Sequence, residues 1–100
     1  MTIRIDPDNN EILALFEMVD FDGQDVLEIG CGDGRLTWLY AERAAHVTGV
    51  DAWEEGIARA KENLPGRLEG RVDFHLTEFE EYAASSPPAV YDLAILAWSL

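Results

Sequence analysis

The chain has 100 residues, of which 48% are hydrophobic, and this composition is typical of one globular domain with a modest core. Its 20 acidic and 7 basic residues give a formal net charge of −13, which argues against a nucleic-acid partner, because phosphate binding requires clustered lysine and arginine. No apolar run is long enough to span a bilayer, and the N-terminus lacks a signal-sequence pattern, so we expect a cytoplasmic protein. The single cysteine, Cys31, excludes an intrachain disulfide and a cysteine-based zinc site.

Residues 1–24 are expected to form an arm and a helix ahead of the main domain. Residues 1–8 have the pattern of an extended arm. Asp8 or Asn9 can cap a helix that reaches about Val19, since apolar residues recur on one face at positions 12, 15, 16 and 19. A turn at residues 21–24 then leads into the domain.

Strands and helices alternate over residues 25–100. Strands are expected at 26–29, 46–51, 71–76 and 92–97, and helices after residue 34, at 53–63 and at 78–84. The residues expected on the buried helix faces are Leu36, Leu39, Tyr40, Ile57, Ala60 and Leu64. This alternation predicts an α/β fold with a parallel sheet, in which the first strand lies centrally, between the second and the fourth.

The last predicted strand, Asp92 to Ala97, is almost wholly apolar, as is typical of a parallel strand covered on both faces. The chain stops at Leu100, just past this strand. We therefore expect the strand to stand at an open sheet edge, which favours self-association, and the chain to be the N-terminal part of a longer protein. The alternative is a complete small protein that covers this edge by oligomerising.

Glycines stand at every second position of the segment that follows the first strand, at Gly30, Gly32 and Gly34. They allow the backbone to pass where a Cβ would clash. A strand that turns through such a loop into a helix N-terminus commonly seats a nucleotide-like ligand. Within the loop, Cys31 is interpreted as a small residue that fits a tight turn rather than as a nucleophile.

With the acid before it, Glu28, the loop has the form E-x-G-x-G-x-G and resembles motif I of the class I S-adenosylmethionine-dependent methyltransferases. The sequence VTGVDAWEEGIARAKENL resembles the second motif of that family, and YDLAILAWSL resembles its motif IV region. The resemblance covers residues 25–100. It implies a Rossmann-like doubly wound parallel sheet, of which this chain would hold the first four strands, in the order 3-2-1-4, of a seven-stranded sheet.

The resemblance also implies roles for individual residues. The glycine loop of that family approaches the methionine part of S-adenosylmethionine, and the motif I acid helps to orient the loop and the amino group of the ligand. Those positions are here Glu28, Gly30, Cys31, Gly32 and Gly34.

An acid at the end of the second strand, Asp51, would accept both ribose hydroxyls. Its alternative role is to cap the next helix, and it can serve as both. Ala52 and Trp53 would pack on the adenine, although Trp53 is equally interpretable as a core residue. Glu78 would accept the adenine amino group, and the backbone N–H of Phe79 would reach a ring nitrogen. The alternative for Glu78 is a first-turn acid favoured by the helix dipole.

Ala97 lies at the ligand end of the last strand, near the methyl group. Many family members have Asn, Ser or Asp near this position, and this chain departs from that pattern, so no role in polarising the acceptor is assigned to Ala97. Asp92, at the far end of that strand, is expected to be structural. His46 and His75 have no cysteine or second histidine at ligand spacing and are interpreted as structural rather than metal-binding.

The resemblance implies a methyltransferase that uses S-adenosyl-L-methionine and acts on a small molecule or a protein rather than a nucleic acid. No residue is assigned as catalytic. One alternative is a dinucleotide-binding oxidoreductase, but its G-x-G-x-x-G fingerprint would require glycine where Arg35 stands. The other alternative is a non-catalytic binding protein with the same fold.

Overall fold

The computed structural model describes residues 2–5, 20–85 and 91–97. The strands are β1 (Thr2–Ile5), β2 (Asp25–Ile29), β3 (His46–Asp51), β4 (Val72–Leu76) and β5 (Leu93–Ala97). The helical segments are η1 (Thr37–Leu39), α2 (Glu54–Asn63), η2 (Gly66–Leu68) and α3 (Phe79–Ser85). Among these segments, none is a helix long and apolar enough to cross a membrane.

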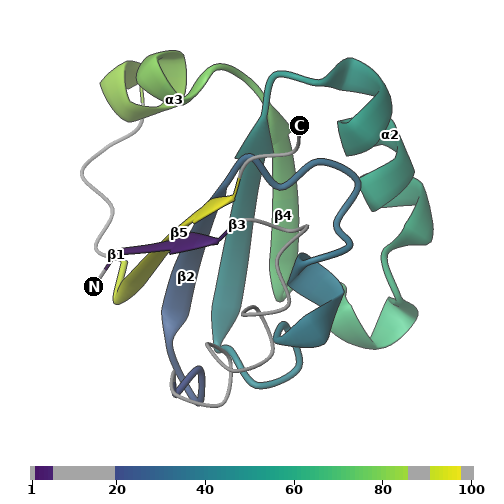
Figure 1. Cartoon of the computed structure of the whole chain (residues 1–100). Helices are drawn as coiled ribbons and strands as arrows, with labels where there is room; N and C mark the ends of the chain where they lie inside the picture. The colour runs from purple at the N-terminus through teal and green to yellow at the C-terminus, as the bar shows by residue number, and fades with distance from the viewer. Residues whose placement is uncertain (1, 6–19, 86–90, 98–100) are drawn as a thin grey trace.

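The strands form one parallel sheet in the order β1-β5-β2-β3-β4 (Figure 1). The four strands predicted from the sequence are β2, β3, β4 and β5, and each begins or ends within a residue of the predicted bounds. β2 lies between β3 and β5, so the predicted order 3-2-1-4 is confirmed. The helices predicted at 53–63 and 78–84 are α2 and α3.

The prediction that the last strand stands at an open edge is wrong. β1, which the sequence pattern indicated only as an extended arm, pairs with β5, and Ile3 lies opposite Ile95. Parallel pairing satisfies the row of backbone N–H and C=O groups that makes an open apolar edge prone to association. The argument for self-association through this strand is therefore lost. The helix predicted at residues 9–19 lies outside the described residues.

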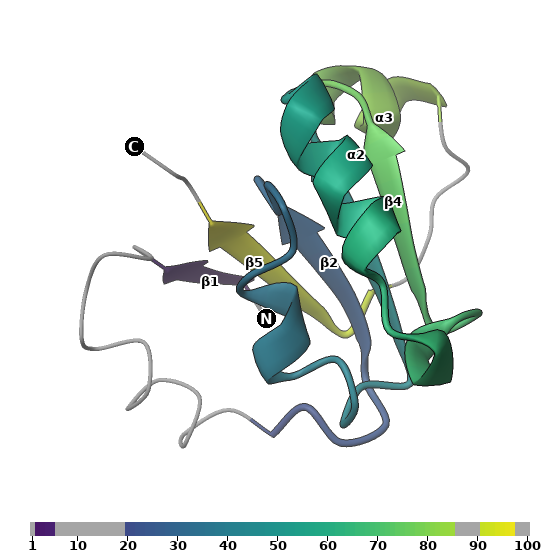
Figure 2. The ribbon, with the colours of Figure 1, turned by 90° about the vertical axis from the view of Figure 1, so that its right-hand side faces the viewer.

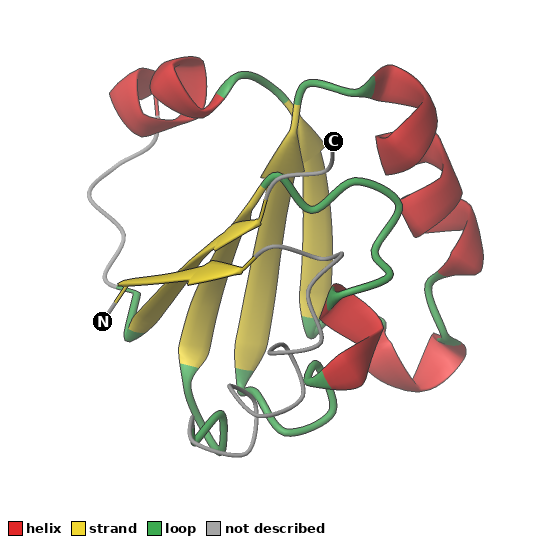
Figure 3. Ribbon diagram, viewed as in Figure 1, coloured by secondary structure: helices red, strands yellow, loops and turns green. Residues whose placement is uncertain are grey.

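α2 and α3 cover opposite faces of the sheet (Figures 2 and 3). Because side chains alternate along a strand, Phe74 and His75 of β4 point to opposite faces. Phe74 belongs to the main buried cluster together with Ile57 and Ala60 of α2. The ring of His75 lies 5.7 Å from that of Tyr82 in α3. The main core therefore lies between the sheet and α2.

The segment after the glycine loop is less helical than predicted, since only η1 and a series of turns follow the loop. Leu36 and Tyr40 are buried as expected, but Leu39 is 56% exposed. The residues buried in this segment are Leu36, Thr37, Tyr40, Ala41 and Ala44. This set recurs on one side of the helical turns, and Leu39 falls on the other side. Thr37 faces inward because its hydroxyl bonds to buried Glu28.

Candidate functional site

The glycine loop lies at the carboxyl end of β2. Gly30, Gly32 and Gly34 have φ values of 82°, 54° and 89°. This left-handed region strains any residue that carries a Cβ, so the alternate glycines match a conformation that the loop needs. The backbone N–H of Gly30 donates to the carbonyl of Val50 at 2.8 Å, which holds the loop against the end of β3.

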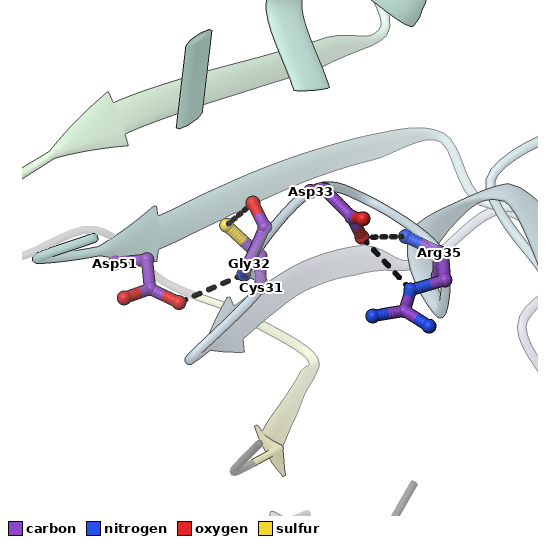
Figure 4. Close-up of polar contacts among 5 residues, drawn as sticks. All are labelled: Cys31, Gly32, Asp33, Arg35 and Asp51. Carbon is purple, nitrogen blue, oxygen red and sulfur yellow. Dashed lines mark hydrogen bonds and ion pairs between the residues drawn. The ribbon is translucent and has the colours of Figure 1, made fainter. Parts of the chain in front are cut away.

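Asp51 joins the loop to the segment that leads into α2 (Figure 4). Its Oδ2 accepts the N–H of Gly32 at 2.8 Å, and its Oδ1 accepts the N–H of Trp53 at 2.9 Å. The residue that precedes α2 is Trp53, which makes no side-chain capping hydrogen bond. Asp51 therefore forms a local turn with Trp53 and not the helix cap that was the alternative to its ligand role. Each carboxylate oxygen retains a second acceptor position.

Glu28 is fully buried beneath the loop. Its Oε1 accepts the hydroxyl of Thr37 at 3.0 Å and that of Tyr40 at 2.5 Å. Its Oε2 is buried and has no hydrogen-bond partner among the described residues. Burial raises the pKa of Glu28 from 4.5 to about 7, against the two hydroxyls, which lower it, and with a smaller upward contribution from Asp51.

Thr37 and Tyr40 were missed by the sequence analysis as site residues. They stand 9 and 12 residues after Glu28, and the hydrophobic pattern marked Tyr40 only as an apolar contact. The available signal was chemical, because a buried tyrosine hydroxyl usually requires a partner. Glu28, which is buried in the strand that precedes this segment, is such a partner.

Cys31 packs into the core below the loop. A Cβ on Gly49 would lie 3.0 Å from the Sγ of Cys31 and 2.9 Å from Cδ1 of Phe74, so this close packing depends on glycine in β3. Burial raises the pKa of the Cys31 thiol well above its usual range, and the charge of Glu28 adds to the effect. A neutral buried thiol is a poor nucleophile, in agreement with the interpretation of Cys31 as a small loop residue.

Trp53 lies across the start of α2 and beside the loop. The side chain is 40% exposed, and its ring lies 3.8 Å from the point where a Cβ on Gly32 would stand. A Cβ on Gly56 would overlap the ring, and the guanidinium carbon of Arg59 lies 5.9 Å from the ring centroid. Trp53 is thus a partly exposed surface beside the loop and not a core residue.

The other predicted cofactor-binding positions also lie at or next to the carboxyl edge of the sheet: Ala52, Glu78, Phe79 and Ala97. The N–H of Thr77 donates to the carbonyl of Asp51 at 2.9 Å, which brings the end of β4 beside the end of β3. Glu78 is exposed between β4 and α3. This edge is where parallel α/β sheets bind ligands.

Arg35 is exposed at the end of the loop, and its side chain folds back toward Asp33. Its side chain is 85% exposed, and its Nε lies 3.2 Å from Oδ1 of Asp33 (Figure 4). The third glycine of a dinucleotide fingerprint serves close packing of helix against strand. At Arg35 no such packing occurs, and the loop differs in this respect from a dinucleotide-binding turn.

The opposite end of the sheet carries contacts between strands. Asp92 Oδ2 accepts the N–H of Asp25 at 2.9 Å, and the Asp92 N–H donates to the Asp25 carbonyl at 2.9 Å. His46 Nε2 lies 2.8 Å from Oδ2 of Asp73. Over residues 2–5, 20–85 and 91–97, no group of three or more His, Cys, Asp or Glu side chains is arranged to hold a metal ion.

Replacing Gly34 with alanine is expected to destabilise the domain by about 1–3 kcal/mol. The substituted residue would have to adopt a φ of 89°, and its Cβ would stand 2.6 Å from Cζ2 of Trp38. Chemical denaturation measures the loss. Gly66→Ala is the matched control, because nothing lies within 4 Å of a Cβ at that position. Equal stability of the two variants would contradict the prediction.

Comparison with known proteins agrees with this geometry. Residues 26–100 match the family model described as a methyltransferase domain. The ubiquinone biosynthesis O-methyltransferase of Marinobacter nauticus is 43% identical over 68 residues, which cover 67% of this chain and 28% of that protein. The magnesium-protoporphyrin O-methyltransferase of Rhodobacter capsulatus is 35% identical over 83 residues, which cover 82% of this chain and 37% of that protein.

A third relative has a different kind of acceptor in its name. The 23S rRNA (uracil(1939)-C(5))-methyltransferase of Methylococcus capsulatus is 41% identical over 56 residues, or 56% of this chain and 13% of that protein. The chain thus spans between 13% and 37% of the length of these three relatives. Among solved structures, an S-adenosylmethionine-dependent methyltransferase from Mesorhizobium loti has a TM-score of 0.71 at 25% identity, covering 89% of this chain and 40% of that chain.

Proposed function

Because the chain belongs to the methyltransferase-domain family, we propose that it binds S-adenosyl-L-methionine and forms the cofactor-binding part of a methyltransferase. The match over residues 26–100 and the sheet order confirm the class I resemblance predicted from the glycine loop. The relatives named above are methyltransferases, and none is a dinucleotide-dependent oxidoreductase.

The residues at the carboxyl edge fit this cofactor. The observation that carries the proposal is the Asp51 carboxylate, which bonds the glycine loop through Gly32 and keeps free acceptor positions. Two acceptor positions on one carboxylate suit a ribose diol. The partly exposed ring of Trp53 offers a stacking surface for adenine beside them. Glu28 adds a buried oxygen without a donor, which suits the ligand's amino group.

When bound, the sulfonium of the cofactor supplies an electrophilic methyl group. The role of the chain's own residues is to hold the cofactor in a fixed position, with Asp51 at the ribose and the loop at the amino-acid part. Orientation of this kind can lower a barrier by roughly 7–11 kcal/mol. A general base is required only where the acceptor loses a proton as it attacks, and we assign none.

We propose a small molecule or a protein as the acceptor. The net charge of −13 opposes the approach of nucleic acid phosphates, and two of the relatives are named as O-methyltransferases of small molecules. The relative that is named as a 23S rRNA methyltransferase makes RNA the competing class of acceptor. The test is to incubate the protein with S-adenosylmethionine that carries a radiolabelled methyl group and with cell extract, and then to separate metabolites, protein and RNA. The fraction that holds the label identifies the class of acceptor. Label in RNA alone would overturn this choice, and binding without any transfer would favour a non-catalytic protein.

Isothermal titration calorimetry tests the cofactor directly. We expect S-adenosylmethionine and S-adenosylhomocysteine to bind with one site per chain, and NAD not to compete. S-adenosylhomocysteine keeps the ribose, adenine and amino group, so its binding depends on the same contacts. Tight binding of NAD with no binding of either methionine derivative would refute the proposal and restore the oxidoreductase alternative.

A further inference from the structure

Two hydroxyls hold one oxygen of the buried Glu28. The hydroxyls of Thr37 and Tyr40 both donate to Oε1, at 3.0 and 2.5 Å. A carboxylate oxygen has two lone pairs, so these bonds use the full capacity of Oε1. Valine and phenylalanine have nearly the same shapes and would satisfy packing alone. The hydroxyls therefore have a purpose beyond filling space, which is to fix the orientation of the carboxyl group.

The second oxygen of Glu28 has the opposite character. Oε2 is buried and has no hydrogen-bond partner among the described residues. Buried acceptors without a donor are uncommon in folded proteins, and each requires an explanation. Glu28 stands two residues before Gly30, and its strand neighbours are Gly49 of β3 and Ile95 of β5, neither of which has a polar side chain. These two paired residues therefore offer Oε2 no side-chain donor.

We propose that Thr37 and Tyr40 are positioning residues for ligand binding, which occupy Oε1 of Glu28 and thereby reserve Oε2 for a donor that arrives with the cationic amino-acid part of the ligand. The inference rests on the proposed function. It adds two residues, outside the glycine motif, that act through Glu28. The occupied oxygen cannot accept a further bond, so the ligand meets a single acceptor of fixed position.

The charges around Glu28 support a cationic partner. The groups that act on it are the hydroxyls of Thr37 and Tyr40, from η1 and the turn after it, and the carboxylate of Asp51 at the end of β3. Cys31, in the loop, is held as a neutral thiol. Within the part of the chain that the structure describes, no cation acts on Glu28, so a positively charged ligand would bring the compensating charge.

The test compares two ligands that differ only in the amino-acid part. S-adenosylhomocysteine carries the ammonium group, and 5′-methylthioadenosine lacks the amino-acid part altogether. For Tyr40→Phe and Thr37→Val in the full chain, we expect S-adenosylhomocysteine to bind about three- to tenfold more weakly and 5′-methylthioadenosine to bind within about twofold of wild type. Tyr91→Phe is the matched control, because the Tyr91 hydroxyl lies 2.7 Å from that of Tyr82 and removing it leaves Glu28 intact.

A pH profile separates positioning from general support of the fold. Wild-type affinity for S-adenosylhomocysteine should fall on acidification through about pH 7, as Glu28 takes up a proton. Tyr40→Phe removes a donor that lowers the pKa of Glu28, so its midpoint should move to higher pH.

Each remaining outcome counts against the inference. Equal weakening of both ligands by Tyr40→Phe and Thr37→Val would show that these residues only support the fold, and no weakening would show that the two hydroxyls do not position Glu28 for the ligand. Thermal denaturation establishes that each variant is folded, and two variants keep the test valid if one fails to fold. Wild-type protein that binds neither ligand would overturn the proposed function, and this inference with it.

Discussion

Replacing Asp51 with alanine is expected to weaken S-adenosylmethionine binding by about a hundredfold. The proposed ribose hydroxyls lose a charged acceptor, and the loop loses the bond from Gly32 N–H to Oδ2. The variant also releases the bond from Trp53 N–H, so the stacking surface loses its support. Calorimetric titration with S-adenosylmethionine measures the effect. Loop and ligand depend on one carboxylate, and this is why the loss should exceed that of an ordinary hydrogen bond.

The matched control is Asp73→Ala, which removes the same charge from β4 but at the pair with His46, away from the loop. It should bind S-adenosylmethionine as the wild type does, so that any loss in Asp51→Ala is not an effect of net charge. Asp51→Asn should lie between the two, because the amide keeps one acceptor oxygen. A folded Asp51→Ala protein with an unchanged dissociation constant would contradict the assignment of Asp51.

The features that the sequence predicted well are those with a local physical cause. The alternation of strand patterns with helix patterns predicted four strands and their order in the sheet, because parallel strands that are joined by helices allow few arrangements. The alternate glycines predicted the loop, and Gly30, Gly32 and Gly34 all adopt positive φ. Asp51 was predicted as a ligand residue and is placed at the loop, while its roles toward a ligand stay a prediction.

The features that the sequence did not predict depend on contacts between distant residues. Pairing of β1 with β5 joins the two ends of the described chain, and no local pattern in Thr2–Ile5 reports its partner. The same holds for the hydroxyls of Thr37 and Tyr40 on Glu28. These bonds turn Thr37 inward and leave Leu39 exposed, against the hydrophobic pattern. In both cases hydrogen bonds between residues far apart in the sequence set the structure, and the periodicity of apolar residues carries no information about such bonds.

Glu28 should contribute to the pH dependence of the free energy of unfolding of the domain, and replacing it with glutamine should remove that contribution. The pKa of Glu28 is about 7 in the folded protein against 4.5 for the free side chain. Between these values the folded protein keeps the proton that the unfolded chain releases, so rising pH favours unfolding. The stabilisation present below pH 4.5 is lost as pH rises through about 7, and the difference corresponds to about 3 kcal/mol.

The measurement is the free energy of unfolding by denaturant between about pH 4 and 8, for wild type and Glu28→Gln. Many of the 20 acidic residues also repel one another as pH rises, so wild type alone would not isolate Glu28. The difference between the two proteins does, because this background is common to both. Wild type should lose about 3 kcal/mol more than Glu28→Gln over this range. Parallel curves would mean that Glu28 titrates alike in the folded and unfolded states, and that its burial beneath the loop does not raise its pKa.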